Sequence, residues 1–539
     1  MDNVIKFIPM KFRSTCYIAA AILLMAWASC KKDLTNANID PTKSTPQAYN
    51  LNFLLTEVQL MYTGSTDFGA ENWYDEWGEI AEFVQHTAST NTAFYSGDKY
   101  LNNVGGFGVY FDHSYIYQVQ PVVELYQLTL NKPQYRNLHQ IARLMKALVF
   151  ERITDLYGDI PYSQAGLGYY SHIFTPVYDK QQDIYTDLIK EVRQATDSLN
   201  DNYDKPSGDV FYSADPGTQI ERWKRFGNTL LLRMGMRLTK VDPTTAQGIV
   251  TSVLGKTMQS NDENAIVQHQ AGNNVTQNRD AWAIFGQDST DVKLCSTYIN
   301  FLKDNNDPRL PVIAWIYWQD ADGNVQTDDD PNDQVGMPPG YIVGGTNPAL
   351  DITKTPTYPQ SLGIYGYSRF NDGVLNNSAP NLVLTYAESE FLLADANKRW
   401  GIGSSAATHY DNGVTAAFTQ LQAYGAGISE ADAADYLTAH PYKDSDGLNM
   451  INTQFWASTI FNEYEAWSNW RRTSSAATPN GYPALTPTHY PGNVTNGTIP
   501  RRLAYPPSEK VSNPANYNAA VARLQGGDHI TSRVWWDTQ

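Results

Sequence analysis

The chain has 539 residues and a formal net charge of −17. Hydrophobic residues make up 42% of it and charged residues only 18%, a composition typical of a packed globular protein and not of a disordered one. The acidic balance excludes a basic surface for nucleic acid, and the mean hydropathy of −0.44 excludes a protein with many membrane spans. Negative charge also suits a neutral ligand better than an anionic one.

The N-terminus has the pattern of an export signal. Basic residues precede an apolar run, 17–27, which is too short to span a bilayer. Two small residues then lead to Cys30, as in a lipobox, where the cysteine is acylated and becomes the mature N-terminus; the alternative is an ordinary signal peptide cut nearby. We expect 1–29 to be removed, Cys30 to carry a lipid that holds the protein at a membrane, and 30–46 to be a polar tether.

Apolar residues recur at intervals of three and four in several segments, which predicts helices. In 134–157, for example, Leu138, Ile141 and Met145 share a face, and Gly158 follows as a stop signal. The other predicted helices are 46–61, 113–130, 179–200, 219–240, 382–399 and 448–470. Their spacing predicts helical hairpins of the tetratricopeptide type, in which 113–130 pairs with 134–157, and 179–200 with 219–240.

Two regions have a different character. In 265–380, clusters of Gly, Pro, Asn and Asp surround short apolar runs, which predicts small strands and long loops. The run 312–319 is followed by Asp322 and Gly323, a turn signal that predicts a β-hairpin. The stretch 472–515 is also loop-rich.

No local pattern of catalytic residues stands out. No two of the nine histidines are close in sequence, and neither a phosphate-binding loop nor a nucleophile elbow is present. The carboxylates Asp75, Glu76 and Glu79 could be taken for the acid pair of a glycosidase, but such acids must flank the scissile bond. We expect these three to lie on a surface helix, and we expect no cofactor.

A second acidic cluster follows the predicted hairpin strand. Asp320, Asp322 and Asn324 are weak calcium candidates, because calcium prefers oxygen ligands. The glycine is at the wrong place for an EF-hand loop, so a solvated acidic turn is the favoured interpretation.

Several motifs together resemble one family, the SusD/RagB-type nutrient-binding lipoproteins of the outer membrane. They occur in the expected order from Cys30 onwards. The most distinctive are TDLYGDIPYSQA (154–165), DPRLP (307–311), TYAESEFLLADA (385–396) and NYNAAVARLQGGDHITSRVWWD (516–537). We interpret the TDLYGDIPY part as structural, since a helix ends at its glycine and its proline turns the chain.

The resemblance implies a mostly α protein in which 47–539 is one interlocked fold. Four degenerate tetratricopeptide-like hairpins, mainly within 47–256 and 382–470, would form the scaffold, and the loops of 265–380 and 472–515 would lie on the ligand side. Such proteins have no enzymatic activity. They face the cell exterior as the lid of a SusC-type TonB-dependent transporter in the outer membrane, and they capture glycans or, in some members, peptides.

A sugar ring has an apolar face that stacks on aromatic rings, so the ligand site is expected among aromatic residues in irregular segments. Alternation along the predicted hairpin strand puts Trp315 and Tyr317 on one face. For a single residue, packing in the core is the competing interpretation. The candidates are Trp73, Tyr74, Trp77, Phe94, Tyr95, Tyr100, Trp282, Phe285, Trp315 and Tyr317.

The leading hypothesis is therefore a surface lipoprotein that captures an oligosaccharide for a transporter. An oligopeptide-capturing subunit of the same kind of transporter is the nearest alternative. A lipid-anchored glycoside hydrolase and a scaffold or adhesin built on helical hairpins are more distant ones.

Overall fold

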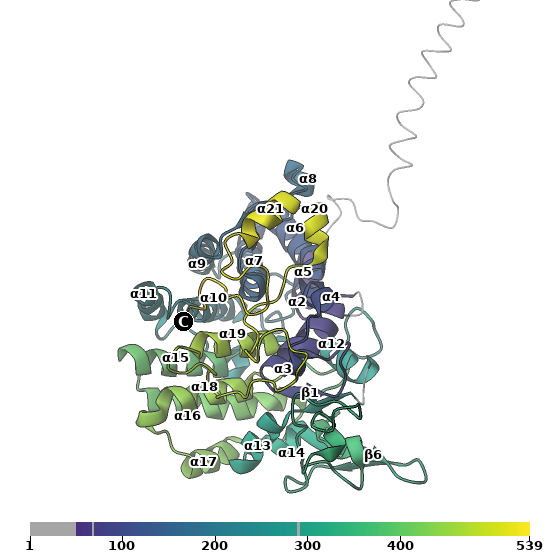
Figure 1. Cartoon of the computed structure of the whole chain (residues 1–539). Coiled ribbons are helices and arrows are strands. Elements are labelled where there is room, and N and C mark those ends of the chain that lie inside the picture. The colour runs from purple at the N-terminus through teal and green to yellow at the C-terminus, as the bar shows by residue number, and fades with distance from the viewer. Residues whose placement is uncertain (1–49, 67–68, 288–290, 539) are drawn as a thin grey trace, which may run out of the picture. The chain divides into compact units, whose positions relative to one another are not determined.

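The computed structural model describes residues 50–538 except 67–68 and 288–290, and it is mostly α-helical with a few short strands, as predicted (Figure 1). The predicted signal peptide, Cys30 and the predicted tether lie outside the described residues. By its internal contacts the chain divides after Leu51 into two units, and the second unit, from Asn52 to Gln539, contains the sheets and nearly all of the helices that the structure describes. None of the described helices is both long enough and apolar enough to cross a membrane.

The first group of scaffold helices stacks in chain order. Helix α6 (Gln120–Thr129) packs against α7 (Arg136–Tyr157), α7 against α9 (Gln181–Ser198), α9 against α10 (Gln219–Arg237), and α10 against α11 (Pro243–Val253). The predicted pairing of neighbouring helices is therefore confirmed. The apolar face of each helix is buried against its neighbours, which is what stabilises helices in such stacks.

The second group of scaffold helices follows later in the chain. Helix α15 (Tyr386–Trp400) packs against α16 (Ala406–Thr419) and α18 (Gly447–Ser458), and it also contacts α10 of the first group. Thr385 caps the start of α15, where its side chain accepts a hydrogen bond from the Glu388 N–H at 3.1 Å. The remaining α-helices are α2 (Leu51–Tyr62), α3 (Ala81–Phe83), α4 (Val104–Phe107), α5 (Val109–Ser114), α8 (Gly168–Ser171), α12 (Arg279–Ala281), α13 (Ser296–Asp304), α14 (Leu310–Ile313), α17 (Glu430–Ala439), α19 (Glu463–Thr473), α20 (Pro507–Ser512) and α21 (Pro514–Val521).

The predicted helix 448–470 was wrong in one respect, because the structure divides it into α18 and α19. Between them the backbone of Phe461 has a positive φ of 84°, which an α-helix cannot contain. The Phe461 ring packs against Phe370 and Tyr424, at 5.4 and 5.2 Å between ring centres. Tertiary packing thus sets this break, and the period of apolar residues does not reveal it.

In the part of the chain that the structure describes, the strands are short and pair in four small sheets. The predicted hairpin is confirmed as β6 (Ala314–Gln319) and β7 (Val325–Asp328), with Gly323 at φ 82° in the turn. A third strand, β8 (Arg369–Phe370), pairs with the other edge of β6. The other pairs are β1 (Thr87–Ser89) with β5 (Val292–Leu294), β2 (Ile160–Pro161) with β3 (Tyr178–Asp179), and β4 (Ala265–Val267) with β9 (Asn381–Leu384).

The TDLYGDIPY motif forms part of the buried core, as its structural interpretation predicts. Asp155 lies near the end of α7, and its Oδ1 accepts hydrogen bonds from the Tyr185 hydroxyl at 2.5 Å and from the Trp536 indole N–H at 2.8 Å. Its Oδ2 accepts one from Arg237 Nε at 3.0 Å. One side chain therefore joins α7, α9, α10 and the C-terminal segment.

Buried ion pairs join α10 of the first helix group to α15 of the second group and to α19. Arg237 donates to Glu465 of α19 at 2.6 Å, and Arg233, one turn earlier on α10, donates to Glu388 of α15 at 2.5 Å. All four side chains are buried. Removing one partner of such a pair leaves an uncompensated charge in the interior, so the pairs fix how the groups are joined.

Candidate functional site

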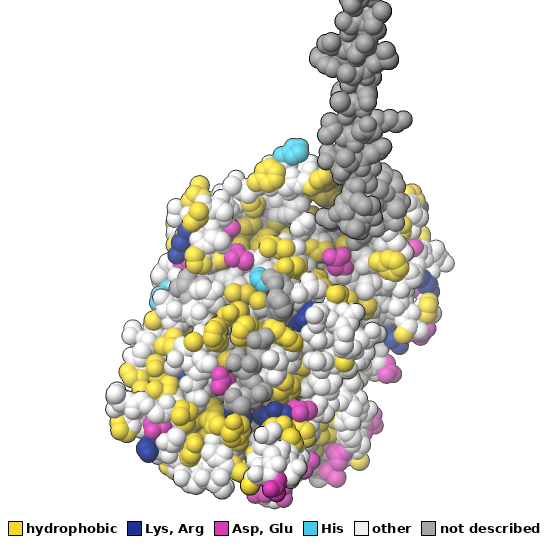
Figure 2. All heavy atoms as spheres, turned by 90° about the vertical axis from the view of Figure 1, so that its right-hand side faces the viewer, with side chains coloured by type: hydrophobic (Ala, Val, Ile, Leu, Met, Phe, Trp, Pro, Cys, Tyr) yellow, Lys and Arg dark blue, Asp and Glu magenta, His cyan; other side chains and the backbone are white. Residues whose placement is uncertain are grey.

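Aromatic side chains gather on one side of the molecule. This is the right-hand side in Figure 1, where α12 and β6 lie, and Figure 2 shows hydrophobic side chains concentrated in the middle of that side. The rings come from the π-helices η1 (Asn72–Ile80) and η6 (Trp282–Gln287), the loop 91–95, β6, and the 3-10 helix η8 (Gly363–Gly366). We call these residues the aromatic face: Trp73, Tyr74, Phe94, Trp282, Phe285, Trp315, Tyr317 and Tyr365.

The first ring group of the aromatic face is centred on Trp73. Its ring centre lies 4.7 Å from that of Tyr74, 5.4 Å from that of Phe94 and 6.3 Å from that of Trp282. Phe94 is stacked on Trp73 at 22° and is 40% exposed, whereas Trp282 meets Trp73 edge-on. Predicted ligand residues from three separate segments of the chain thus lie in one cluster.

A glycine lets the Phe94 loop approach η1 this closely. A Cβ at Gly78 would lie 2.5 Å from the Phe94 carbonyl oxygen, closer than any real side chain tolerates. The Ser96 N–H donates to the Gly78 carbonyl at 3.1 Å, and the Tyr95 hydroxyl donates to the Ala283 carbonyl of η6 at 3.1 Å. The loop is therefore held against both π-helices.

Three of the predicted ligand residues are buried in the core and are not part of the aromatic face. Trp77 is 0% exposed, and its indole N–H donates to Asp280 at 2.9 Å. Tyr95 and Tyr100 are also buried in the core. We correct the prediction for these three: spacing in the sequence places them near the other rings, but it does not reveal that their rings point inward.

The buried carboxylate of Asp280 holds the segments beneath the aromatic face together through hydrogen bonds. Besides Trp77, it accepts hydrogen bonds from Asn72 Nδ2 at 2.8 Å and from Asn381 Nδ2 at 2.6 Å. It thereby joins η1, α12 and β9 at one point. A binding face needs rings that are held in place before the ligand arrives, and this network supplies that support.

The second ring group surrounds a basic side chain, Arg369 of β8. Its guanidinium carbon lies 4.1 Å from the ring centre of Tyr317, 4.7 Å from that of Phe285 and 5.9 Å from that of Trp315. Arg369 lies opposite Trp315 in the β6–β8 pairing. The predicted placement of Trp315 and Tyr317 on one face of the strand is therefore confirmed. Phe285 and Trp282 both lie on η6, which links the two ring groups.

The carboxylates of η1 are not on a surface helix, so that prediction was wrong. Asp75, Glu76 and Glu79 are all buried, and each accepts a hydrogen bond from a structural group. Burial raises the pKa of all three above the ordinary range, and it raises the pKa of Glu79 to about 8. The η1 helix therefore presents its acidic side to the interior and its Trp73 and Tyr74 rings to the aromatic face.

The weak calcium candidates form a turn. Asp320 Oδ1 accepts hydrogen bonds from the N–H groups of Asp322 and Asn324, at 3.0 and 2.9 Å, which closes the β6–β7 turn. Within the described residues no group of three or more His, Cys, Asp and Glu side chains is arranged to hold a metal ion.

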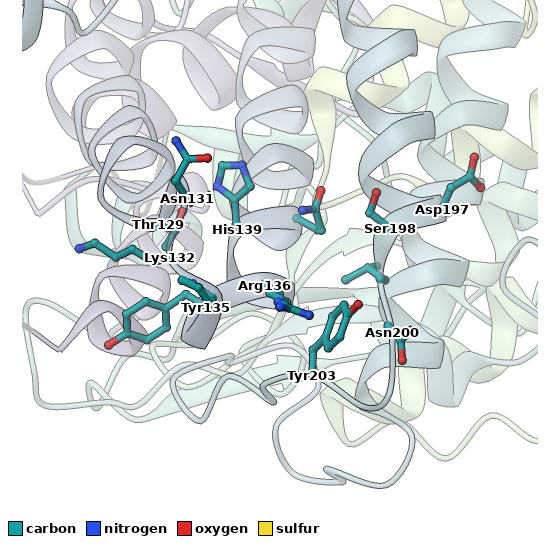
Figure 3. Close-up of a pocket in the computed structure, with 13 residues that line it drawn as sticks. Thr129, Asn131, Lys132, Tyr135, Arg136, His139, Asp197, Ser198, Asn200 and Tyr203 are labelled. Carbon is teal, nitrogen blue, oxygen red and sulfur yellow. Dashed lines mark hydrogen bonds between the residues drawn. The ribbon is translucent and has the colours of Figure 1, made fainter.

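A separate pocket of about 630 Å³ lies where the α6–α7 link meets the end of α9 (Figure 3). Its lining is mostly polar, and Lys132 and Asp197 lie on opposite sides of it. Arg136 covers the Tyr203 ring with its guanidinium carbon 4.6 Å from the ring centre. Because that ring is covered and none of the predicted ligand residues lines the pocket, the aromatic face is the better candidate for a sugar site.

Comparison with known proteins identifies the family. The family model described as "Starch-binding associating with outer membrane", SusD-like, matches residues 44–506. The chain belongs to this SusD-like family. No curated protein matches the chain.

Solved structures agree with this assignment. A structure named as a chitin-binding protein is 31% identical, with a TM-score of 0.76, and the alignment covers 91% of this chain and 100% of that one. A Bacteroidetes SusD-like structure, AC2a, is 24% identical with a TM-score of 0.77 and the same coverage. A chitin-binding SusD homologue from Flavobacterium johnsoniae is 22% identical with a TM-score of 0.68, over 90% of this chain and 98% of that one.

Three residues at the site were not predicted from the sequence: Arg369, Tyr365 and Lys293, whose Nζ lies 5.8 Å from the ring centre of Tyr365. All three lie in the loop-rich region 265–380, where the irregular backbone gives no period to follow. The aromatic search could have found Tyr365, which is exposed. Nothing local marks Arg369 or Lys293, because their neighbours come from distant segments of the chain.

Proposed function

We propose that the protein captures an oligosaccharide on the aromatic face and delivers it to a SusC-type TonB-dependent transporter at the outer membrane. The observation that carries the proposal is the gathering of partly exposed rings, on irregular segments, beside a rigid helical scaffold. Membership of the SusD-like family supports both the glycan and the membrane association. Loops on a rigid scaffold are the usual place for a binding site.

The rings suit a sugar better than a flat aromatic ligand or a helix. Trp73, Phe94 and Trp282 meet at different angles, so they form a curved surface and not a single plane. A glycan chain offers an apolar C–H face at each residue and hydroxyl groups at its edges, and such faces stack on rings. Each stacked ring should contribute about 0.5–1.5 kcal/mol, as aromatic pairs do.

The first ligand to test is a β-1,4-linked N-acetylglucosamine oligomer. Two of the solved relatives are named as chitin-binding, and one of them is 31% identical to this chain. This supports an oligosaccharide of that class as the ligand.

Titration calorimetry with tetra-N-acetylglucosamine tests the proposal. Phe94→Ala and Trp282→Ala should each weaken binding about tenfold. The melting temperature should change little for Phe94→Ala, because the side chain lies at the surface and is 40% exposed. The matched control is Tyr169→Ala, which removes an exposed ring on α8, away from the aromatic face. Retained binding in both face variants would contradict the site.

A peptide ligand would give a different result. If glycan mixtures show no binding and a peptide library does, with the same face variants affected, the oligopeptide alternative is correct. Turnover of a glycan during the titration would instead indicate an enzyme.

The membrane anchor needs its own test. Cys30→Ala should abolish acylation and release the protein from the membrane fraction. A variant that stays bound after a high-salt wash would show that the lipid is not the anchor. Co-purification of the wild-type protein with a large β-barrel transporter tests the proposed partner.

A further inference from the structure

Two basic side chains lie next to each other at the second ring group. Arg369 is on β8 and Lys293 is on β5, and the Leu294 N–H donates to the Ser368 carbonyl at 2.9 Å, which joins these segments. The two side chains are 6% and 2% exposed. Like charges held close together with little water repel each other, so this arrangement needs a reason.

Not all hydrogen-bond donors of the Arg369 guanidinium have an acceptor among the described residues. Its Nη2 donates to Asp372, but Nε and Nη1 donate to no residue in the described part of the chain. Nε is fully buried, whereas Nη1 is not. The rings of Tyr317 and Phe285 hold the guanidinium in place. An arginine fixed in this way presents a preorganised donor to whatever lies above the rings.

Lys293 also lacks an acceptor. Its Nζ lies 5.8 Å from the ring centre of Tyr365, and no described residue accepts a hydrogen bond from it. Asp291, which is two positions earlier, already accepts a hydrogen bond from Asn91 Nδ2 at 2.9 Å. Burial, with a smaller effect from Arg369, lowers the pKa of Lys293 to about 8. The lysine is therefore still mostly charged at neutral pH.

Arg369 and Lys293 determine which chemical group of a ligand can bind beside them. A donor that is nearly buried and has no acceptor is costly, and an acceptor from the ligand removes that cost. A ligand with a positive charge would add to the repulsion instead. The required group is thus an oxygen acceptor without a cationic neighbour.

We propose that Arg369 and Lys293 select acylated amino sugars over free ones: the acetamido oxygen of the sugar accepts a hydrogen bond from Arg369 Nη1, and the two positive charges repel the ammonium group of a deacetylated sugar. This inference rests on the proposed function, because it names the substrate class of the same site. No covalent step is involved.

Three tetrasaccharides with the same β-1,4 linkage test it by titration calorimetry: tetra-N-acetylglucosamine, cellotetraose, which has no nitrogen, and tetraglucosamine. The measurements are made at about pH 5.5, where the free amines carry charge. We expect tetra-N-acetylglucosamine to bind about tenfold or more tightly than tetraglucosamine. Cellotetraose should fall between them, since it lacks both the acyl oxygen and the charge.

Variants then assign the effect to the two residues. Arg369→Met and Lys293→Met keep most of the side-chain volume without the charge, and each should reduce the preference to about threefold or less. Asp372→Asn removes the acid beside Arg369 and should strengthen the exclusion of tetraglucosamine. This third variant tests the inference even if the methionine variants do not fold. Arg143→Met, which breaks the Arg143–Glu191 pair between α7 and α9, is the matched control and should leave the preference unchanged.

Two outcomes would overturn the inference alone, and a third would overturn the proposed function as well. Equal binding of the acetylated and free tetrasaccharides by the wild-type protein overturns the inference and leaves the proposed function intact. If folded Arg369→Met and Lys293→Met proteins prefer tetra-N-acetylglucosamine over tetraglucosamine as strongly as the wild type does, the inference is also overturned and the proposed function again stands. If the wild-type protein binds none of the three, the proposed function fails and this inference fails with it.

Discussion

The indole N–H of Trp536 donates to the Asp155 carboxylate at 2.8 Å, although 381 positions separate the two residues in the chain. Asp155 belongs to the TDLYGDIPYSQA motif (154–165), and Trp536 belongs to the C-terminal motif (516–537). Each side chain therefore supplies a hydrogen-bond partner for the buried polar group of the other.

Trp536→Phe should destabilise the protein by about 1–3 kcal/mol, because it removes one donor from a buried carboxylate and leaves the ring in place. Urea unfolding measures this. Trp535→Phe is the control, since Trp535 is half-buried and its indole donates to no described residue. Equal stability of the two variants would show that the hydrogen bond to Asp155 contributes nothing.

Gly78→Ala should weaken both stability and glycan binding. The added Cβ would clash with the Phe94 carbonyl oxygen, so the loop that carries Phe94 must move away from η1. Gly248→Ala is the matched control: Gly248 is exposed on α11 with no atom near its missing Cβ. That change should stabilise the protein by about 0.5–1 kcal/mol. Thermal unfolding and titration of both variants check the contrast, and full binding by Gly78→Ala would refute it.

Trp77→Ala and Phe94→Ala should separate the core from the binding face. The buried Trp77 packs edge-on against Phe370, with ring centres 5.4 Å apart, so its removal should cost about 3–5 kcal/mol of stability. Phe94→Ala should instead weaken binding with little change in unfolding. Melting temperature and affinity are measured for both. A Phe94→Ala protein as destabilised as Trp77→Ala would mean that Phe94 is a core residue.

Glu79→Gln should make stability less dependent on pH. The pKa of Glu79 is raised from 4.5 to about 8 in the folded protein, so between these values the folded state holds a proton that the unfolded state has lost. The folding free energy of the wild type therefore becomes less favourable as pH rises through this window. The variant should gain melting temperature relative to wild type towards pH 8 and lose that advantage towards pH 4.5.

The exposed Glu430 of α17 provides the control for this experiment, as Glu430→Gln. The melting temperature of the Glu430→Gln variant should vary with pH in the same way as that of the wild type. Parallel curves for Glu79→Gln and wild type would show that the Glu79 carboxyl does not titrate in this range.

Local periodicity was sufficient to predict the long helices. The predicted segments 134–157, 179–200 and 219–240 agree with α7, α9 and α10 to within a few residues. Each of these helices buries one continuous face, and this burial leaves a period in the sequence. The boundary at Phe461 could not be predicted, because packing by Phe370 and Tyr424 sets it and neither residue is near in sequence.

The site was predictable only in part for the same reason. Composition and turn residues pointed to Trp73, Phe94, Trp282 and Trp315, but depth of burial depends on the whole fold. Trp77 is only four positions from Trp73, yet it is fully buried whereas Trp73 is partly exposed. A basic side chain such as Arg369 becomes part of a site only when three distant segments surround it.

The bond between Asp155 and Trp536 also bears on the order in which the chain can fold. A growing chain that has reached only the second helix group holds Asp155 with one of its partners still missing. Contacts of such long range are slow to form, because the intervening chain must first be brought together. The protein should therefore acquire its full cooperative stability only after residue 536 has emerged, and an interrupted chain should remain open to proteases until then.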